Sequence, residues 1–206
     1  MGVRQDDRKW THIDWELENV TAKMISWFWC NMEKGFALWH PNEHMDFYWA
    51  IKPKNNNPIG SIHVAPQRWS DGTLTKPHIR MEDVATLPED IADIIIYDHA
   101  VVVAGISLTE EDYKPDNPPL AYRIHQWEKT DFGVKGMSSA IPLAPEPLEV
   151  ERGLVWAKHA AEEVRYWQDF LPELYKLWSV VKNPELNPYF SFKIKREGKT
   201  LRYATD

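Results

Sequence analysis

The sequence contains a single cysteine, Cys30, so no disulfide can form within the chain and nothing points to an oxidising compartment. No apolar run approaches the ~20 residues that a membrane-spanning helix requires. The first ten residues, MGVRQDDRKW, are charged, and no apolar segment follows them as it does in a secretory signal. These absences predict a cytoplasmic protein that does not bind membranes.

Basic residues are also in the minority, because 24 Lys and Arg face 31 Asp and Glu, which gives a net charge of -7. A general nucleic-acid binder needs a basic face, so this class is excluded. The chain has no internal repeat and no low-complexity tract, and its 206 residues suit one domain over residues 1–206. The chain is rich in tryptophan, with 11 residues. Such large, flat side chains suit a wide core or an aromatic-lined pocket, and core packing is the simpler explanation.

The stretch 155–175, VWAKHAAEEVRYWQDFLPELY, carries the clearest chemical signal. Its apolar residues recur at helical spacing, which predicts a long helix that starts near Leu148 and ends in the turn around Leu171-Pro172. His159 and Glu163 are four residues apart, so their side chains are neighbours on one face and can reach one metal ion. The alternative is a core histidine beside a solvated glutamate, and Glu162 competes with Glu163 for the same role.

A second group of candidate ligands lies in GFALWHPNEHMDFYWAIKP. Pro41 prevents a continuous helix here, which predicts a tight turn or a single helical turn over Pro41–His44. His40 and His44 are both candidate metal ligands, and the alternative for each is a buried or stacking histidine.

The rest of the chain predicts an early helix followed by antiparallel strands. Asn19-Val20-Thr21 offers a helix start for Val20–Trp29, and Gly35 ends or interrupts that helix. Strands are expected at 59–64, 78–84, 94–106 (interrupted at Asp98-His99), 121–129, 133–143 and 189–194, with 121–143 forming a hairpin. An antiparallel sheet with one apolar face must cover that face, and the long helix does so. The fold class is therefore α+β with a helix-grip arrangement, a curved sheet around a long C-terminal helix with a cavity between them.

Two stretches together resemble one family. ISWFWCNMEKGFALWHPNEH resembles the aromatic run and the YxxWxPxxH motif of the diacetylphloroglucinol hydrolases, which include phloretin hydrolase-like enzymes. HAAEEVRYWQDFLPELY resembles their HxxxE helix, which also ends in a Leu-Pro-x-Leu-Tyr run. Between them, IHQWEKTDFGVKGMSS is similar to a His-containing hairpin that precedes a Met-Arg-Ser motif. The resemblance covers about residues 20–178.

The resemblance implies a Bet v 1-like (START-like) helix-grip fold and a zinc-dependent hydrolase that cleaves the carbon–carbon bond between a polyhydroxyphenyl ring and an acyl group. An activated water attacks the ketone, and a histidine, here His125, protonates the ring carbon. The implied Zn²⁺ ligands are His44, His159 and Glu163, with a further glutamate that we assign to Glu82, or else His78. The substrate pocket would include Phe36, Trp39 and Ala140.

Two departures from the family pattern concern the substrate. Phe36 replaces the motif's tyrosine, and the family's Met-Arg-Ser-Arg-Phe run is MSSAI here, so an aromatic residue is lost near Ala140. The metal could therefore persist while the substrate changes. The expected partner is a small aromatic ketone or polyphenol, and a homodimer is left open. The alternatives are a non-catalytic carrier of an aromatic ligand and a metal hydrolase that acts on a different ketone or ester.

Overall fold

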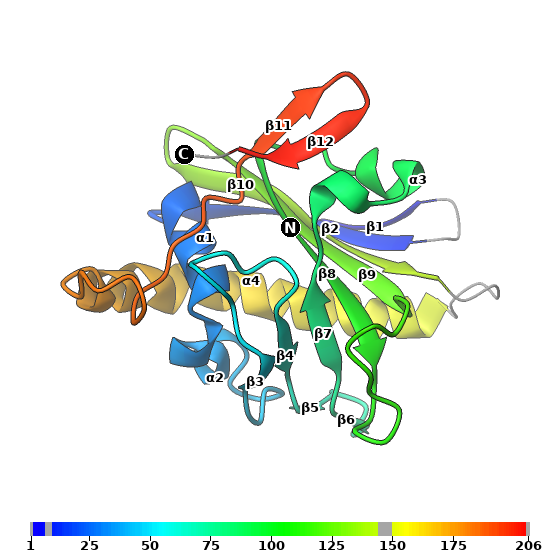
Figure 1. Ribbon diagram of the computed structural model, residues 1–206. Coiled ribbons are helices and arrows are strands. Elements are labelled where there is room, and N and C mark those ends of the chain that lie inside the picture. The colour runs from blue at the N-terminus through cyan, green and yellow to red at the C-terminus, as the bar shows by residue number, and fades with distance from the viewer. Residues whose placement is uncertain (1, 7–9, 144–149, 205–206) are drawn as a thin grey trace.

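The computed structural model describes residues 2–6, 10–143 and 150–204 (Figure 1), and its centre is an eight-stranded antiparallel sheet. The strand order is β1-β2-β10-β9-β8-β7-β4-β3. The bounds are β1 Gly2–Asp6, β2 Trp10–Glu18, β3 Tyr48–Ile51, β4 Ile62–Val64, β7 His78–Met81, β8 His99–Ser107, β9 Ala121–Lys129 and β10 Gly133–Pro142. Two small hairpins, β5 (Gln67–Arg68) with β6 (Leu74–Thr75) and β11 (Ile194–Glu197) with β12 (Thr200–Tyr203), complete the strands.

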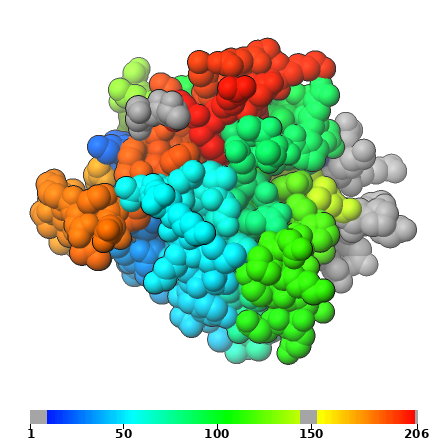
Figure 2. Space-filling view, viewed as in Figure 1, coloured from blue at the N-terminus to red at the C-terminus, as the bar shows by residue number. Residues whose placement is uncertain are grey.

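The long helix α4 (Val150–Trp178) crosses one face of the sheet, behind it in Figure 1. The short helices α1 (Ala22–Cys30) and α2 (Phe36–Trp39) lie against α4, and the 3₁₀ turn η1 (Met32–Lys34) connects them. On the opposite face, η2 (Val84–Thr86), α3 (Glu89–Ala92) and the β11–β12 hairpin form the cover; Figure 2 shows the red hairpin against the green segment that contains α3. The predicted α+β helix-grip arrangement is confirmed.

Tryptophan side chains fill the layer between the sheet and the helices. Trp15, Trp29, Trp127 and Trp167 are each at most 2% exposed. The rings of Trp15, Trp29 and Phe28 each meet that of Trp167 edge to face, and the Phe28 ring lies 5.8 Å from it. Core packing therefore accounts for much of the tryptophan content, as the composition suggests.

The helix starts and the hairpin follow the sequence signals closely. Thr21 caps α1, because its Oγ1 accepts a hydrogen bond from the backbone N–H of Met24 at 3.2 Å. Gly35 separates η1 from α2 as expected. The β9–β10 hairpin confirms the turn predicted at 130–133.

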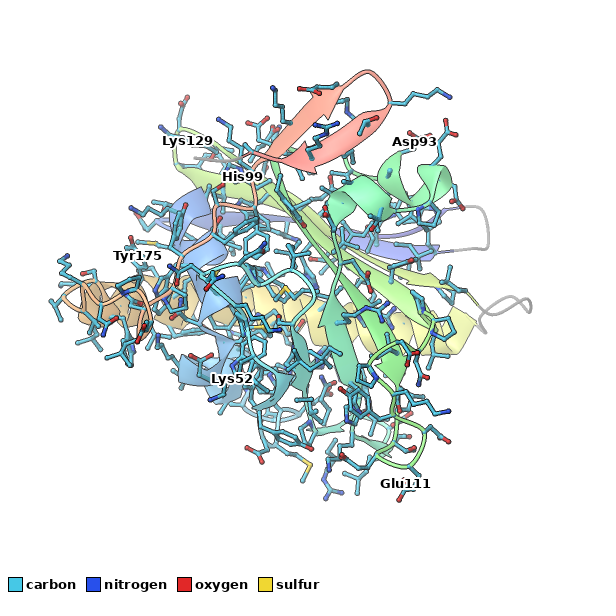
Figure 3. The ribbon with its side chains drawn as sticks, viewed as in Figure 1. Lys52, Asp93, His99, Glu111, Lys129 and Tyr175 are labelled. Atoms are coloured by element: carbon cyan, nitrogen blue, oxygen red, sulfur yellow. The ribbon has the colours of Figure 1, made fainter. Side chains whose placement is uncertain are left out.

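The predicted end of the long helix at Leu171-Pro172 is wrong, since α4 continues through Pro172 to Trp178. Proline removes one intrahelical hydrogen bond, but packing of the following turn offsets the loss. Tyr175 stacks edge-on against Trp27 of α1 with ring centroids 5.4 Å apart (Figure 3), and Leu174 packs against the same core. The predicted start at Leu148 lies outside the described residues.

Strand predictions fail at both ends of the chain. No strand is expected at 10–18, yet these residues form β2: Ile13, Trp15 and Leu17 are buried and alternate with Asp14, Glu16 and Glu18, which is the period of a half-buried strand. The strand expected at 189–194 is absent, and the final strands are instead β11 and β12. Among the described residues, no helix has both the length and the apolarity that crossing a membrane would demand.

Gly136 on β10 provides a test of how closely the sheet and its neighbours pack. A Cβ at this position would collide with the carbonyl oxygen of Gln126 and the ring of Trp15, whereas a Cβ on Gly105 of β8 would meet nothing. We expect Gly136→Ala to lower the free energy of unfolding by about 1–3 kcal/mol or more, as overpacking does. Gly105→Ala should be neutral or slightly stabilising. Urea unfolding of the two variants beside the wild type measures the difference, and equal effects would contradict this packing.

Candidate metal centre

The candidate site lies between the turn at 40–44 and the middle of α4. Pro41 ends α2, and the backbone N–H of His44 donates to the carbonyl of His40 at 2.9 Å, which closes one turn as the sequence predicts. His44 also forms a bridge to Gln67 of β5, which fixes the end of the turn. The turn thus holds its histidines against the helix.

The structure brings together His44, His159 and Glu163, which lie far apart in the sequence. Glu163 Oε1 is 3.2 Å from Nε2 of His44 and 3.2 Å from Nε2 of His159. All three side chains are buried. One carboxylate oxygen therefore faces two imidazole nitrogens in a part of the interior that is only slightly exposed to solvent.

The other nitrogen of each imidazole has a partner that fixes the orientation of the ring. His44 Nδ1 is 2.8 Å from the carbonyl oxygen of Phe36, and a carbonyl only accepts, so His44 Nδ1–H donates. His159 Nδ1 lies 2.6 Å from Glu43 Oε2. Histidines that bind metals usually donate their second N–H to a carbonyl or a carboxylate in this way.

Glu43 was not predicted from the sequence. Its neighbour His44 was predicted, and in a regular helix or strand the side chains of adjacent residues point in different directions. The turn at 40–44 instead brings the side chains of both Glu43 and His44 to His159. The only signal was the acidic residue inside the PNEH segment.

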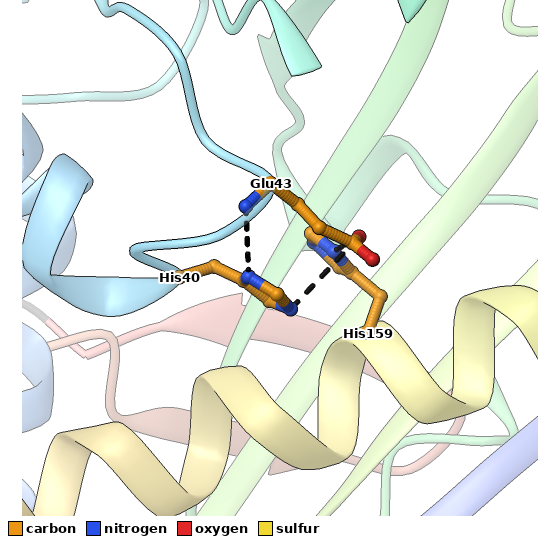
Figure 4. Close-up of side chains that lie close together, drawn as sticks. All are labelled: His40, Glu43 and His159. Atoms are coloured by element: carbon orange, nitrogen blue, oxygen red, sulfur yellow. Dashed lines mark hydrogen bonds and ion pairs between the residues drawn. The ribbon is translucent and has the colours of Figure 1, made fainter. Parts of the chain in front are cut away.

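His40 belongs to a second group with Glu43 and His159 (Figure 4). Its ring stacks on that of His159, with centroids 4.5 Å apart and planes 10° from parallel. His40 Nδ1 accepts from the backbone N–H of Glu43 at 3.2 Å, so its Nε2 carries the proton and points toward Glu162 Oε2, 3.5 Å away. His40, Glu43 and His159 thus form a second group of potential ligands beside His44, His159 and Glu163.

The electrostatics show that the cluster needs a cation. Burial disfavours a charged Glu163, but His159 and His44 outweigh burial and hold the pKa of this carboxyl well below its usual range. Burial likewise opposes the charge on His159, but Glu163 and Glu43 raise its pKa to about 9. The carboxylates thus demand positive charge at this point, from a proton or from a metal ion.

The separations between these donor atoms are those that a bound Zn²⁺ would give, and they also lie within hydrogen-bond range. Zinc bonds to nitrogen and oxygen of about 2.0–2.2 Å at tetrahedral angles place neighbouring ligand atoms about 3.3 Å apart. Both distances to Glu163 Oε1 are 3.2 Å. Aromatic rings surround the cluster, since Phe36 stacks on His44 at 3.8 Å and Trp69 lies 4.8 Å from His159.

Glu82 does not join this cluster, and the assignment of a ligand to this position is corrected. Ile79 and Met81 of β7 pack in the core beneath α4, so Glu82 points to the opposite face, where its Oε1 accepts from Arg80 Nε at 2.8 Å. The alternative His78 is also remote, stacked on Tyr113 at 4.0 Å. Neither lies in a group of potential ligands among the described residues.

His125 on β9 lies near the cluster but belongs to a separate contact network. Its Nδ1 is 3.0 Å from Ser138 Oγ, which also accepts the indole N–H of Trp15 at 3.0 Å. Its ring packs 5.0 Å from that of Trp29. Burial lowers the pKa of His125 to about 4, a shift that the negative charge of Glu163 partly offsets, so the imidazole is neutral at pH 7.

The three side chains predicted to line a substrate pocket are buried around the cluster. Phe36 and Trp39 are 4% exposed and pack against His44, and Ala140 on β10 is equally buried. A hollow of about 680 Å³ lies elsewhere, lined in part by Cys30, Trp49 and Lys52 (Lys52 is labelled in Figure 3). The three predicted pocket residues therefore surround the cluster as packed side chains.

Comparisons with known proteins concern the fold. No family model matches the chain, and no curated protein matches its sequence. Protein Ms6760 from Mycobacterium smegmatis matches in structure with a TM-score of 0.58 at 15% identity, over 83% of this chain and 96% of that one. Major latex-like protein 151 from Panax ginseng matches with a TM-score of 0.52 at 7% identity, over 78% and 97%. Such likenesses show the fold alone, and with Ara h 8.0201 (TM-score 0.51) they confirm the Bet v 1-like helix-grip fold.

The lowered pKa of His125 predicts acid sensitivity. The unfolded chain binds a proton at this residue below about pH 6.5, whereas the folded chain does so only near pH 4, so stability present above pH 6.5 is lost as the pH falls toward 4. The residue's share is up to about 3 kcal/mol. We expect His125→Gln to flatten the pH dependence of the unfolding free energy between pH 6.5 and 4, measured with urea in metal-free protein. An unchanged slope would contradict the burial of a neutral imidazole.

Proposed function

We propose that this protein is a zinc-dependent hydrolase that cleaves the carbon–carbon bond between an aromatic ring and an acyl group of a small aryl ketone. The observation that carries the proposal is the convergence of His44 Nε2 and His159 Nε2 on Glu163 Oε1, each at 3.2 Å. Both rings are oriented through Nδ1, by the carbonyl of Phe36 and by Glu43. Two imidazoles and one carboxylate, with a further position left for water or substrate, are a catalytic zinc donor set.

The resemblance to the diacetylphloroglucinol hydrolases supports the same reaction. Its two outer motifs supply His44 and the pair His159 and Glu163, and these are the residues that meet in space. The family's fourth ligand has no counterpart at Glu82. Glu43 is the remaining carboxylate of the centre, and it acts through His159 Nδ1.

A bound zinc ion supplies a Lewis acid that polarises a carbonyl and lowers the pKa of a water molecule. The reaction adds water across the ring–acyl bond, so that the acyl carbon leaves as a carboxylic acid and the ring carbon gains a proton. His125 is neutral at pH 7 and so acts first as a base, which takes a proton from water and then returns it to the ring carbon. Ser138 Oγ holds its ring at Nδ1. The packed rings of Trp29 and Trp39 exclude bulk water.

A second candidate function is a non-catalytic carrier of a small aromatic ligand. The helix-grip fold supports it, since the di-domain ARO/CYC protein StfQ of the steffimycin biosynthetic pathway matches with a TM-score of 0.50 at 9% identity, over 81% of this chain and 52% of that one. Phe36 also lacks the hydroxyl of the family's tyrosine. A hydrolase of another ketone or ester would use the same zinc ligands.

Zinc content tests the metal proposal, and adjacent glutamates provide matched variants. Glu163→Gln removes the charged oxygen that faces both imidazoles, so we expect its zinc affinity to fall at least 10-fold. Glu162→Gln changes a side chain that is 33% exposed, pairs with His40 and belongs to neither group of potential ligands, so zinc binding should remain within about twofold of wild type. Mass spectrometry of the metal and competition with a chelator measure both.

Wild-type protein that holds far less than one zinc per chain after zinc loading would exclude the proposal. So would equal affinities in the two glutamine variants.

Turnover tests the reaction. Zinc-loaded protein incubated with 2,4,6-trihydroxyacetophenone should release phloroglucinol and acetate, which mass spectrometry detects. We expect His125→Gln to retain zinc and to lose activity by about 10²–10⁴-fold, the usual contribution of an acid–base residue. Full recovery of unchanged, bound ketone would favour the carrier, and products from another ketone or ester would favour a different hydrolase.

A further inference from the structure

Arg123 places a cation inside the helix grip that the proposed reaction does not use. It lies on β9, opposite Ala140 of β10 and Val103 of β8 in register. Directly opposed residues of antiparallel strands share a face, and both neighbours belong to the core beneath α4, so Arg123 faces the helix as well. Its guanidinium lies over the ring of Trp156 on α4, 5.4 Å from the centroid.

The guanidinium has little to bind within the protein. Within the described part of the chain it makes one hydrogen bond, from Nη1 to the carbonyl of Tyr122 at 3.0 Å, although arginine offers five donors. No carboxylate in the described part of the chain lies within 4.0 Å of it. By contrast, Arg80, on the face of the sheet opposite to α4, pairs with Glu82 at 2.8 Å. A cation that is largely withdrawn from water is usually paired with an acid, and half-buried Arg123 has no acidic partner among the described residues. Burial lowers its pKa to about 10, which leaves it charged at neutral pH.

Position relates this cation to the metal centre. Arg123 and His125 are two residues apart on β9 and share the face toward the helix. On α4, Trp156 precedes His159 by one turn and Glu163 by two, so the guanidinium lies about 5–10 Å along the helix from the ligands. The charge of Arg123 lies close enough to Glu163 to interact with it electrostatically. This separation matches the length of one substituted aromatic ring.

Local shape agrees with an anchoring role. The cross-strand neighbours Ala140 and Val103 are small, so neither side chain covers the guanidinium from the strands beside it. Arg123 is half-buried, whereas His125 and Trp127 on the same face are buried, so among these three side chains solvent reaches Arg123 most readily. Arg–carboxylate pairs form two parallel hydrogen bonds, which also fix the orientation of the bound molecule.

We propose that Arg123 binds a carboxylate of the molecule that is processed at the metal centre, so that the substrate class is an aromatic keto acid. That the bound molecule is a substrate rests on the proposed function. That Arg123 binds a carboxylate does not, because it is argued from the surroundings of Arg123 alone. The carboxylate would occupy the guanidinium donors while the carbonyl faces His44, His159 and Glu163.

Two probes of equal shape test the proposal, 4-acetylbenzoate and its neutral analogue 4-acetylbenzamide. Isothermal titration calorimetry on the full chain should show the carboxylate binding at least 10-fold more tightly than the amide. Arg123→Gln should weaken the carboxylate at least 10-fold and change the amide by less than twofold. Arg123→Lys should retain part of the preference. Lys135→Gln, which removes an exposed cation of β10 paired with Glu128, should change neither affinity.

Titrations of zinc-loaded and of chelator-treated protein separate this proposal from the proposed function. A carboxylate preference that depends on Arg123 in zinc-free protein supports anion binding, whatever the fate of the hydrolase. Equal affinities for the two probes in wild type, no binding of either probe, or equal weakening of both in Arg123→Gln would each overturn it. If circular dichroism shows that Arg123→Gln does not fold, the test rests on the ratio of the wild-type affinities for the two probes and on the affinities of Arg123→Lys.

Discussion

The buried carboxylate of Glu163 is the constraint on which the rest of the site depends. An ionised carboxylate away from water is costly unless positive charge and hydrogen bonds accompany it. Here two imidazole Nε2 atoms face one of its oxygens, and each ring is fixed through Nδ1 by a group outside the trio. The turn at 40–44 and the middle of α4 must therefore be held in register to within a fraction of an ångström.

The aromatic layer provides that register. Trp39, at the end of α2 and next to the turn, stacks on Trp167 of α4 with centroids 5.2 Å apart and planes 15° from parallel. Trp29 of α1 packs edge-on against both rings. Interiors are close-packed and transmit small shifts, so these contacts tie the turn to the helix. The tryptophan content thus serves the geometry of the site as well as the stability of the core.

Much of this follows from sequence, and the failures have local causes. Helical spacing predicts that His159 and Glu163 are neighbours, and Pro41 predicts the turn. Spacing within a segment does not predict that two distant segments meet, and only the family resemblance indicated this contact. The alternation in HIRMEDV could have excluded Glu82, since the apolar Ile79 and Met81 must face the helix and Glu82 then cannot. Glu43 depends on the path of a turn, which residue patterns do not encode, and the extension past Pro172 depends on tertiary packing.

Charge balance connects the metal centre with Arg123. The described cluster buries two carboxylates, Glu43 and Glu163, so one imidazolium at His159 leaves a net charge of -1, whereas a divalent cation with neutral imidazoles gives zero. When the metal centre has no net charge, the positive charge of Arg123 on the same interior face is not balanced by the centre. That surplus charge would favour an anionic occupant over a neutral one of the same shape, because bringing a second anion into this layer then restores neutrality. By the same balance, we expect metal-free protein to bind such an anion less tightly, because its cluster keeps a net negative charge.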